Sequence, residues 1–119
     1  EIVDIYNTAA NKIKSNANTD EYSKLVEPYK NAEVLYIDDL FKTEKGKSPT
    51  AADVNVAFEI LNHRYINQEL ITIISSEKTI EEMLDIDEAV GSRIYEMSKR
   101  YCICINPDKN KNYRLRGTI

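Results

Sequence analysis

The sequence has 119 residues, 42% of them hydrophobic, and a net charge of −4, which suits a single domain with one core. The acidic balance excludes a chain-wide cationic surface that would hold nucleic acid non-specifically, so any DNA contact would be local. No apolar stretch reaches the length of a membrane span and no signal peptide opens the chain, which predicts a cytoplasmic protein.

The stretch before residue 34 predicts two helices. Apolar residues recur at helical spacing between Ile2 and Ile13, in a helix without an obvious N-cap. A polar break follows, after which Thr19 or Asp20 can cap a short second helix. Pro28 is expected to end or kink that helix because proline has no backbone N–H to donate.

The apolar run Val34-Leu35-Tyr36-Ile37 predicts a strand buried on both faces of a parallel sheet. Asp38 and Asp39 follow directly, at the carboxyl end of the strand, where ligands bind in open α/β sheets. The two carboxylates can present their oxygens to a metal ion or a water molecule there. The alternative is that they only cap a helix or form an acidic turn.

The middle of the chain predicts a long helix and a second strand. The helix enters at Pro49 and runs to about Asn67, with Arg64 beside or opposite its apolar face. A second buried strand, Leu70–Ser75, ends in the polar sequence Ser75-Ser76-Glu77. If the two strands are neighbours, their polar tips share one crevice.

The last third predicts two short helices, a third strand and a tail. Thr79 and Glu82 form a capping box at the start of the first helix, and helical turns follow Gly91. Residues Tyr101–Ile105 predict the third strand, and Tyr113–Arg116 is expected to be extended or a short edge strand.

Cys102 and Cys104 are the only cysteines and lie two positions apart in the third predicted strand. No second pair completes a zinc site, and such close positions on one strand are poor disulfide partners. Both are therefore interpreted as small core hydrophobes.

Strands that alternate with helices predict an α/β fold with a parallel sheet. Carboxylates, hydroxyls and water suit magnesium, and Arg93, Arg114 and Arg116 are available cations for phosphoryl chemistry. A phosphate cradle is missing, because the sequence contains no G-x-x-x-x-G-K-[ST] motif and only three glycines.

Several stretches together carry a family resemblance. The run from Val34 to Leu40 resembles a Walker B motif of AAA+ ATPases. The further stretches that extend the resemblance are Ile60-Leu61-Asn62-His63-Arg64-Tyr65, Thr72-Ile73-Ile74-Ser75-Ser76, Gly91-Ser92-Arg93-Ile94-Tyr95-Glu96-Met97 and Tyr113-Arg114-Leu115-Arg116. In this order they resemble the C-terminal part of the ATPase domain of DnaC/DnaI-type replicative helicase loaders, including phage and prophage forms, and the related transposition helper IstB.

The resemblance implies a three-layer P-loop NTPase fold and a role for each matching residue. Asp38 is similar to the Walker B acid linked to magnesium, and Asp39 to the acid that positions water. Ser75, Ser76 or Glu77 occupies the sensor-1 region, where many relatives have asparagine in place of Glu77. Two arginines complete the set: Arg93 resembles an arginine finger that acts on a neighbouring subunit, and Arg114 a sensor-2-like or tail arginine.

The sequence departs from this family because no Walker A strand or loop precedes the Walker B-like run. Residues 1–119 are therefore expected to be a partial AAA+ domain, which by itself binds and hydrolyses ATP poorly. In the family, the Walker A strand lies between the sensor-1 strand and the last strand. Its absence predicts that Ile71–Ser75 and Tyr101–Ile105 pair with each other or with a second copy of the chain, including a strand exchange.

The function expected from the resemblance is that of an ATP-dependent DNA replication protein that loads a hexameric replicative helicase. Its parent protein would use ATP and Mg²⁺ and contact the helicase, single-stranded DNA and its own copies. Two alternatives stay open: a receiver-like phosphoacceptor domain that binds magnesium, and a non-catalytic interaction module in which the acids merely cap.

Overall fold

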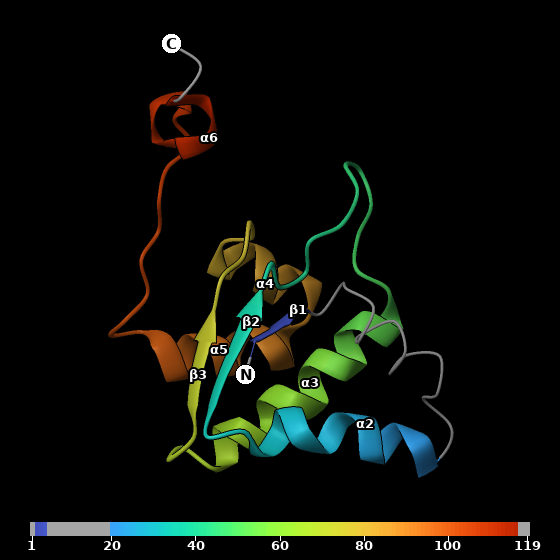
Figure 1. Ribbon diagram of the computed structural model, residues 1–119. Helices are drawn as coiled ribbons and strands as arrows, with labels where there is room; N and C mark the ends of the chain where they lie inside the picture. The colour runs from blue at the N-terminus through green and yellow to red at the C-terminus, as the bar shows by residue number, and fades with distance from the viewer. Residues whose placement is uncertain (1, 5–19, 117–119) are drawn as a thin grey trace.

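The computed structural model describes residues 2–4 and 20–116, and the side chains of residues 22–114 within them. In chain order the elements are β1 (Ile2–Asp4), α2 (Asp20–Asn31), β2 (Val34–Asp38), α3 (Ala51–Ile66), β3 (Ile71–Ile74), α4 (Ile80–Ile86), α5 (Glu88–Ser98), a 3₁₀ turn η1 (Lys109–Lys111) and α6 (Tyr113–Arg116) (Figure 1). None of the helices in this part of the chain is long and apolar enough to cross a membrane.

The sheet is parallel, with the strands in the order β1-β2-β3 and β2 in the middle. The predicted alternation of strands and helices is therefore present in an α/β fold. The predicted helix from Ile2 to Ile13 is wrong at its start, because Ile2–Asp4 is a strand that pairs with Tyr36–Asp38. An apolar pair such as Ile2-Val3 fits the periodicity of a helix and that of a strand equally well. Pairing with the edge of β2 makes this stretch a strand. Residues 5–13 of that prediction lie outside the described part.

The helices cover one face of the sheet. Leu35 and Ile37 of β2 are fully buried in one cluster with apolar residues of α2, α3, α4 and α5. Figure 1 shows α5 crossing behind β2 and β3. The opposite face is open, since Ile71 is 57% exposed and Ile73 is 47% exposed. Burial of both strands on both faces was therefore a wrong prediction. The described residues form two layers, and the three-layer P-loop fold stays a prediction.

The helix ends follow the sequence closely. Thr50 caps α3 in a capping box with Asp53, and Thr79 caps α4 in the predicted box with Glu82. Pro28 does not end α2, which continues to Asn31 because the carbonyl of Pro28 still accepts the N–H of Ala32 at 3.0 Å. Proline removes its own donor but keeps its acceptor.

The predicted third strand is absent. Residues 101–105 have no regular structure, and Tyr101, Ile103 and Ile105 are 81%, 85% and 73% exposed. Cys102 and Cys104 are also exposed, so their interpretation as core residues was wrong. Residues Tyr113–Arg116 form the short helix α6 instead of an extended segment. A strand needs a neighbouring strand to accept and donate its backbone hydrogen bonds, and no described strand pairs with this apolar run.

Arg64 of α3 is the one cation inside the described core, with 1% of its surface exposed. Its guanidinium donates to the carbonyls of Tyr29, Lys30 and Ala32 around the end of α2, at 3.2, 3.2 and 2.7 Å. It also donates to the Thr72 hydroxyl and the Ile71 carbonyl of β3, both at 2.7 Å. Burial lowers the pKa of Arg64 from its usual value, and the carbonyl dipoles at the end of α2 compensate the charge.

Replacing Arg64 with methionine should lower the free energy of unfolding by about 3 kcal/mol, because several buried carbonyls would lose their donor together. Urea denaturation followed by circular dichroism measures this loss. The matched control is His63→Ala, since the His63 ring contacts only the amide side chains of Asn31 at 3.1 Å and Asn67 at 3.5 Å among the described residues, and its removal should cost no more than about 0.5 kcal/mol. Equal stability of the two variants would contradict the role given to Arg64.

Gly91 lets α4 and α5 approach each other closely. A Cβ placed there would lie 2.8 Å from the backbone nitrogen of Leu84 and 2.9 Å from its Cα. Backbone atoms of a packed helix cannot move aside as a flexible side chain would. The glycine is therefore required by the contact between the helices, in spite of its low helix propensity.

Gly91→Ala should lower the free energy of unfolding by about 1–3 kcal/mol through overpacking. At an unconstrained helix position the same change would stabilise the chain by up to about 1 kcal/mol. The sign of the effect in urea denaturation is thus diagnostic. Ser92→Ala at the exposed neighbouring position is the control and should be close to neutral.

Candidate functional site

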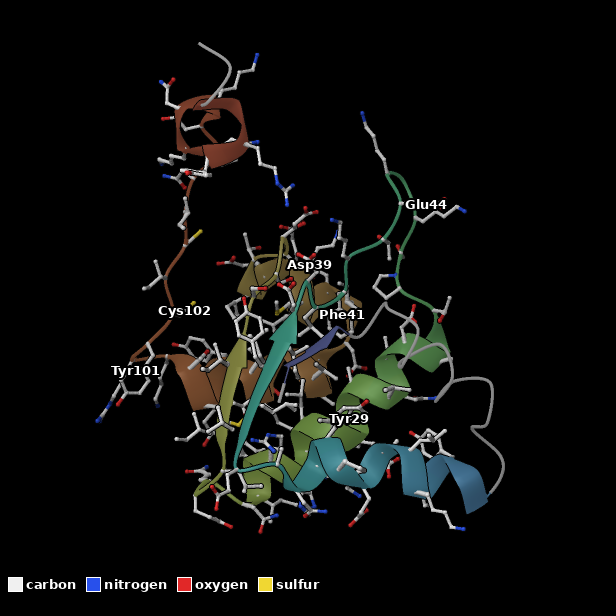
Figure 2. All side chains as sticks on the ribbon, viewed as in Figure 1. Tyr29, Asp39, Phe41, Glu44, Tyr101 and Cys102 are labelled. Carbon is white, nitrogen blue, oxygen red and sulfur yellow. The ribbon has the colours of Figure 1, made fainter. Side chains whose placement is uncertain are left out.

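The tips of β2 and β3 meet, as the sequence predicted for two neighbouring strands. The Ser75 hydroxyl donates to Oδ1 of Asp38 at 2.6 Å, and its oxygen accepts the backbone N–H of Asp39 at 3.1 Å. One hydroxyl therefore connects the two acids to the end of β3. This arrangement fixes the Asp38 carboxylate in one orientation at the carboxyl edge of the sheet, where Figure 2 shows Asp39.

The turn after β2 has an unusual backbone. Asp39 and Phe41 have φ values of 54° and 62°, in the left-handed region that residues other than glycine rarely adopt. The intervening Leu40 is held at both backbone groups: its N–H donates to the Ser75 carbonyl at 2.9 Å and its carbonyl accepts the Ser76 hydroxyl at 2.6 Å. Leu40 and Phe41 are fully buried, so packing holds the turn in this conformation. Such backbone strain is typical of functional sites.

Lys42 is a site residue that the sequence prediction missed. Its Nζ lies 3.8 Å from Oδ2 of Asp39 and 3.9 Å from Oε1 of Glu77. The side chains are well exposed, so this pairing contributes little to stability, but it places a cation beside the acidic pair. Lys42 follows Asp39 by three residues, and this spacing is the sequence feature from which the contact could have been predicted.

The oxygen-rich composition of this site is compatible with magnesium. Asp38, Asp39 and Ser75 supply hard oxygen ligands, and Mg²⁺ usually takes one or two protein carboxylates and completes its shell with water or phosphate. Within residues 22–114, no group of three or more histidine, cysteine, aspartate or glutamate side chains is placed to hold a metal by itself. The described residues of the site thus offer a partial set of oxygen ligands.

Arg93 does not join the acids in the described contacts. Its guanidinium lies over the rings of Phe58 and Tyr65, 5.2 and 5.5 Å from their centroids. Its Nε donates to Oδ1 of Asn62 at 3.0 Å, and it also donates to the Ala89 carbonyl at 2.9 Å. The contacts with Phe58, Tyr65 and Asn62 join α5 to α3, and the contact with Ala89 lies within α5. The Glu96 carboxylate, which accepts the Tyr65 hydroxyl at 2.8 Å, raises the pKa of Tyr65.

Arg114 also lies apart from the acids. It belongs to α6, which Figure 1 shows at the end of the segment that leads away from α5. Its backbone N–H donates to Oδ1 of Asn112 at 3.0 Å, and its side chain is exposed. The structure therefore brings together Asp38, Asp39, Ser75, Ser76 and Glu77 of the predicted site residues, and neither predicted arginine.

The chain matches no known protein-family model and no solved structure. It is 45% identical over 102 residues to the uncharacterized protein YqaM of Bacillus subtilis strain 168, over 83% of this chain and 32% of YqaM. It is 46% identical over 91 residues to the phage-like element PBSX protein XkdC of the same strain, over 74% of this chain and 34% of XkdC. The chain thus spans about a third of the length of these curated relatives.

The link between Asp38 and Ser75 can be measured by a double-mutant cycle. Asp38→Ala, Ser75→Ala and the double variant should reveal a coupling free energy of about 1–2 kcal/mol in urea denaturation, because either single variant already removes the hydrogen bond to the carboxylate. The control cycle pairs Asp38→Ala with Ser76→Ala, whose hydroxyl bonds the Leu40 carbonyl instead. Its coupling should be near zero, and equal couplings would contradict the assigned geometry.

Proposed function

We propose that this chain is part of an AAA+ ATPase domain of the DnaC/DnaI type, from a protein that loads a replicative helicase onto DNA with the use of ATP. The observation that carries the proposal is the contact between the tips of two parallel strands, where Ser75 of β3 holds Asp38 of β2 at 2.6 Å. A Walker B acid beside a polar sensor residue requires this juxtaposition. The similarity to a protein of a phage-like element agrees with the phage forms of such loaders.

Under this proposal the acids divide the work between them. Asp38, oriented by Ser75, would hold Mg²⁺ or one of its waters, and the metal would neutralise charge on the phosphates of ATP. Asp39 lies one residue further on the strained turn, with its side chain partly exposed, and would orient the attacking water. Ser76 and Glu77 complete the sensor region, and Arg114 remains a proposed tail cation.

Arg93 would act on the nucleotide of a neighbouring copy. This role is consistent with the described contacts of Arg93, none of which involves the acids of its own copy. The proposal has a structural competitor, because Arg93 also joins α5 to α3 through Asn62 and Phe58. The two roles differ in what the residue's removal does to a folded protein. A finger affects the hydrolysis rate, whereas a helix contact affects stability.

The test uses a longer protein that contains this chain together with a phosphate-binding loop. Asp39→Asn there should lower kcat for ATP hydrolysis by at least about 100-fold and leave ATP bound, since a positioned base contributes on that scale. Glu44→Gln is the matched control, because Glu44 is an exposed carboxylate of the same loop that pairs with Lys47 at 2.9 Å. Hydrolysis at the unmodified rate by the Asp39 variant would refute the proposal.

The same protein separates the two roles of Arg93. Arg93→Ala should abolish hydrolysis. Asn62→Ala removes the hydrogen bond but keeps the guanidinium, so this variant should retain hydrolysis, with a free energy of unfolding similar to that of Arg93→Ala.

Calorimetry on the 119-residue chain should find weak binding of Mg–ATP, because the sequence lacks a Walker A motif. Co-purification of the longer protein with a hexameric helicase tests the loading role.

A receiver-like phosphoacceptor is the second candidate, and Lys42 is the observation that favours it. Such a site needs an acidic pair, an aspartate on another strand, a hydroxyl and a lysine, and Lys42 lies 3.8 Å from Asp39. Beryllofluoride with Mg²⁺ should then bind the chain, and Asp38→Asn should abolish the binding. Absence of any beryllofluoride effect on the unmodified chain would eliminate this candidate.

The third candidate is a non-catalytic interaction module. If both Asp38→Asn and Asp39→Asn leave the longer protein active, the acids only cap the turn.

A further inference from the structure

Three side chains of α3 form one row that contacts Arg93 of α5. Phe58, Asn62 and Tyr65 are spaced by four and then three residues, which places them on the same face of the helix. The Cζ atom of Arg93 lies 5.2 and 5.5 Å from the centroids of the two rings, and its Nε donates to Oδ1 of Asn62 at 3.0 Å. The row therefore restrains the guanidinium itself.

The partners in these contacts orient the guanidinium without neutralising it. They are two aromatic rings, the amide of Asn62 and the backbone carbonyl of Ala89, which accepts Nη1 of Arg93 at 2.9 Å. None of these four partners is an anion. Of the five N–H groups of a guanidinium, the contacts within residues 22–114 use two. Three N–H groups and the positive charge can therefore bind a phosphate.

Arg64 provides a comparison with a structural arginine of the same fold. All three nitrogens of its guanidinium donate to described acceptors, in five hydrogen bonds, and only 1% of the residue is exposed. Arg93 is half-buried and makes two described hydrogen bonds. This difference favours a guanidinium that is oriented toward a ligand over one that only joins two helices.

The Tyr65 ring is itself fixed from α5. Its hydroxyl donates to Oε2 of Glu96 at 2.8 Å, and Glu96 follows Arg93 by three residues, about one helical turn. In the described contacts this acid accepts from Tyr65 and not from Arg93. The outer end of the ring is thus held, and with it the aromatic face that attracts the guanidinium.

We propose that Phe58 and Tyr65 are positioning residues for Arg93, whose guanidinium their rings hold in the plane in which it reaches a phosphate of the nucleotide bound by a neighbouring copy. The inference rests on the proposed ATPase function and names the residues that prepare Arg93 for it. Two rings restrain the plane more than one hydrogen bond does, so the loss of Asn62 alone is tolerated. A displacement of about 1 Å from the productive geometry can cost about 100-fold in rate.

The test uses the longer protein with a phosphate-binding loop, and replaces Tyr65 because Phe58 also packs against the core. Tyr65→Leu removes the ring and should lower kcat for ATP hydrolysis by about tenfold through misplacement of Arg93. The KM for ATP should not change, because Arg93 would act on the transition state. Tyr65→Phe keeps the ring and should restore kcat to within about twofold of the unmodified protein.

Tyr95→Leu is the matched control. Tyr95 is 53% exposed and follows Arg93 by two residues in α5, and residues at this spacing lie on different sides of a helix. Its replacement should leave kcat unchanged.

Mixing of variants separates positioning from a loss of folding. A chain with Asp39→Asn keeps an intact Arg93 and its rings, and a chain with Tyr65→Leu keeps the acids. Because Arg93 would act on a neighbouring copy, the mixture should hydrolyse ATP faster than the mean of the two separate chains. Tyr65→Leu mixed with a chain that carries both changes should show no gain, since neither chain then supplies a positioned Arg93.

The geometry also has a readout that does not involve ATP. In the 119-residue chain, the NMR order parameter of the Arg93 Nε–H group should exceed that of the exposed Arg100. Tyr65→Leu should lower this order parameter toward the value of Arg100, and Tyr65→Phe should leave it high. An Arg93 side chain as mobile as that of Arg100 in the unmodified chain would overturn the inference.

The outcomes distinguish failure of this inference from failure of the proposed function. If Arg93→Ala abolishes hydrolysis and Tyr65→Leu keeps the unmodified rate, the positioning role is wrong and the proposed function stands. Equal losses in Tyr65→Leu and Tyr65→Phe would also overturn the positioning role, since the ring would then not matter. If Arg93→Ala keeps the unmodified rate, the role of Arg93 in the proposed function fails, and the positioning role fails with it.

Discussion

The structure depends on one buried cation. Arg64 connects the end of α2 to the beginning of β3 by donating to the carbonyls of Ala32 and Ile71, both at 2.7 Å. Because β2 follows α2 directly, this contact sets where both strands begin. Their ends are then in register, with Ile37 opposite Ile74. The meeting of Asp38 and Ser75 at the other end of the strands is a consequence of this alignment.

Strain and hydrogen bonding at the acidic tip reinforce each other. The left-handed conformations of Asp39 and Phe41 cost free energy of about 1–3 kcal/mol each, and the burial of Leu40 and Phe41 together with two serine hydroxyls compensates for it. The result is a carboxylate pair whose first member is fixed and whose second is partly exposed beside Lys42. A fixed acid beside an accessible one suits metal binding and water orientation, the chemistry that the proposed ATPase function requires.

The same sheet is incomplete on its other side. Helices from α2 to α5 bury one face through Leu35 and Ile37, whereas the opposite face and the outer edge of β3 stay exposed. The large side chains of the segment 101–105 are exposed as well. Within the described residues, the chain therefore combines a well-packed centre with exposed apolar surfaces.

Local chemistry was readable from the sequence alone. The Thr79–Glu82 capping box, the helices α3 and α4, the β2 strand and the acidic pair all depend on residues within a few positions of one another, and the structure has them. Tertiary structure alone decided the features that depend on distant partners. A run of apolar residues does not reveal whether one face or two will be covered, so β2 and β3 were predicted too buried. Nor does such a run reveal whether a neighbouring strand is present to pair with it. Residues 101–105 were therefore predicted to be a strand, whereas the structure has no regular element there. The burial of Arg64 and the approach of Lys42 to Glu77 likewise became visible only when the chain was folded, because both join elements that are separate in the sequence.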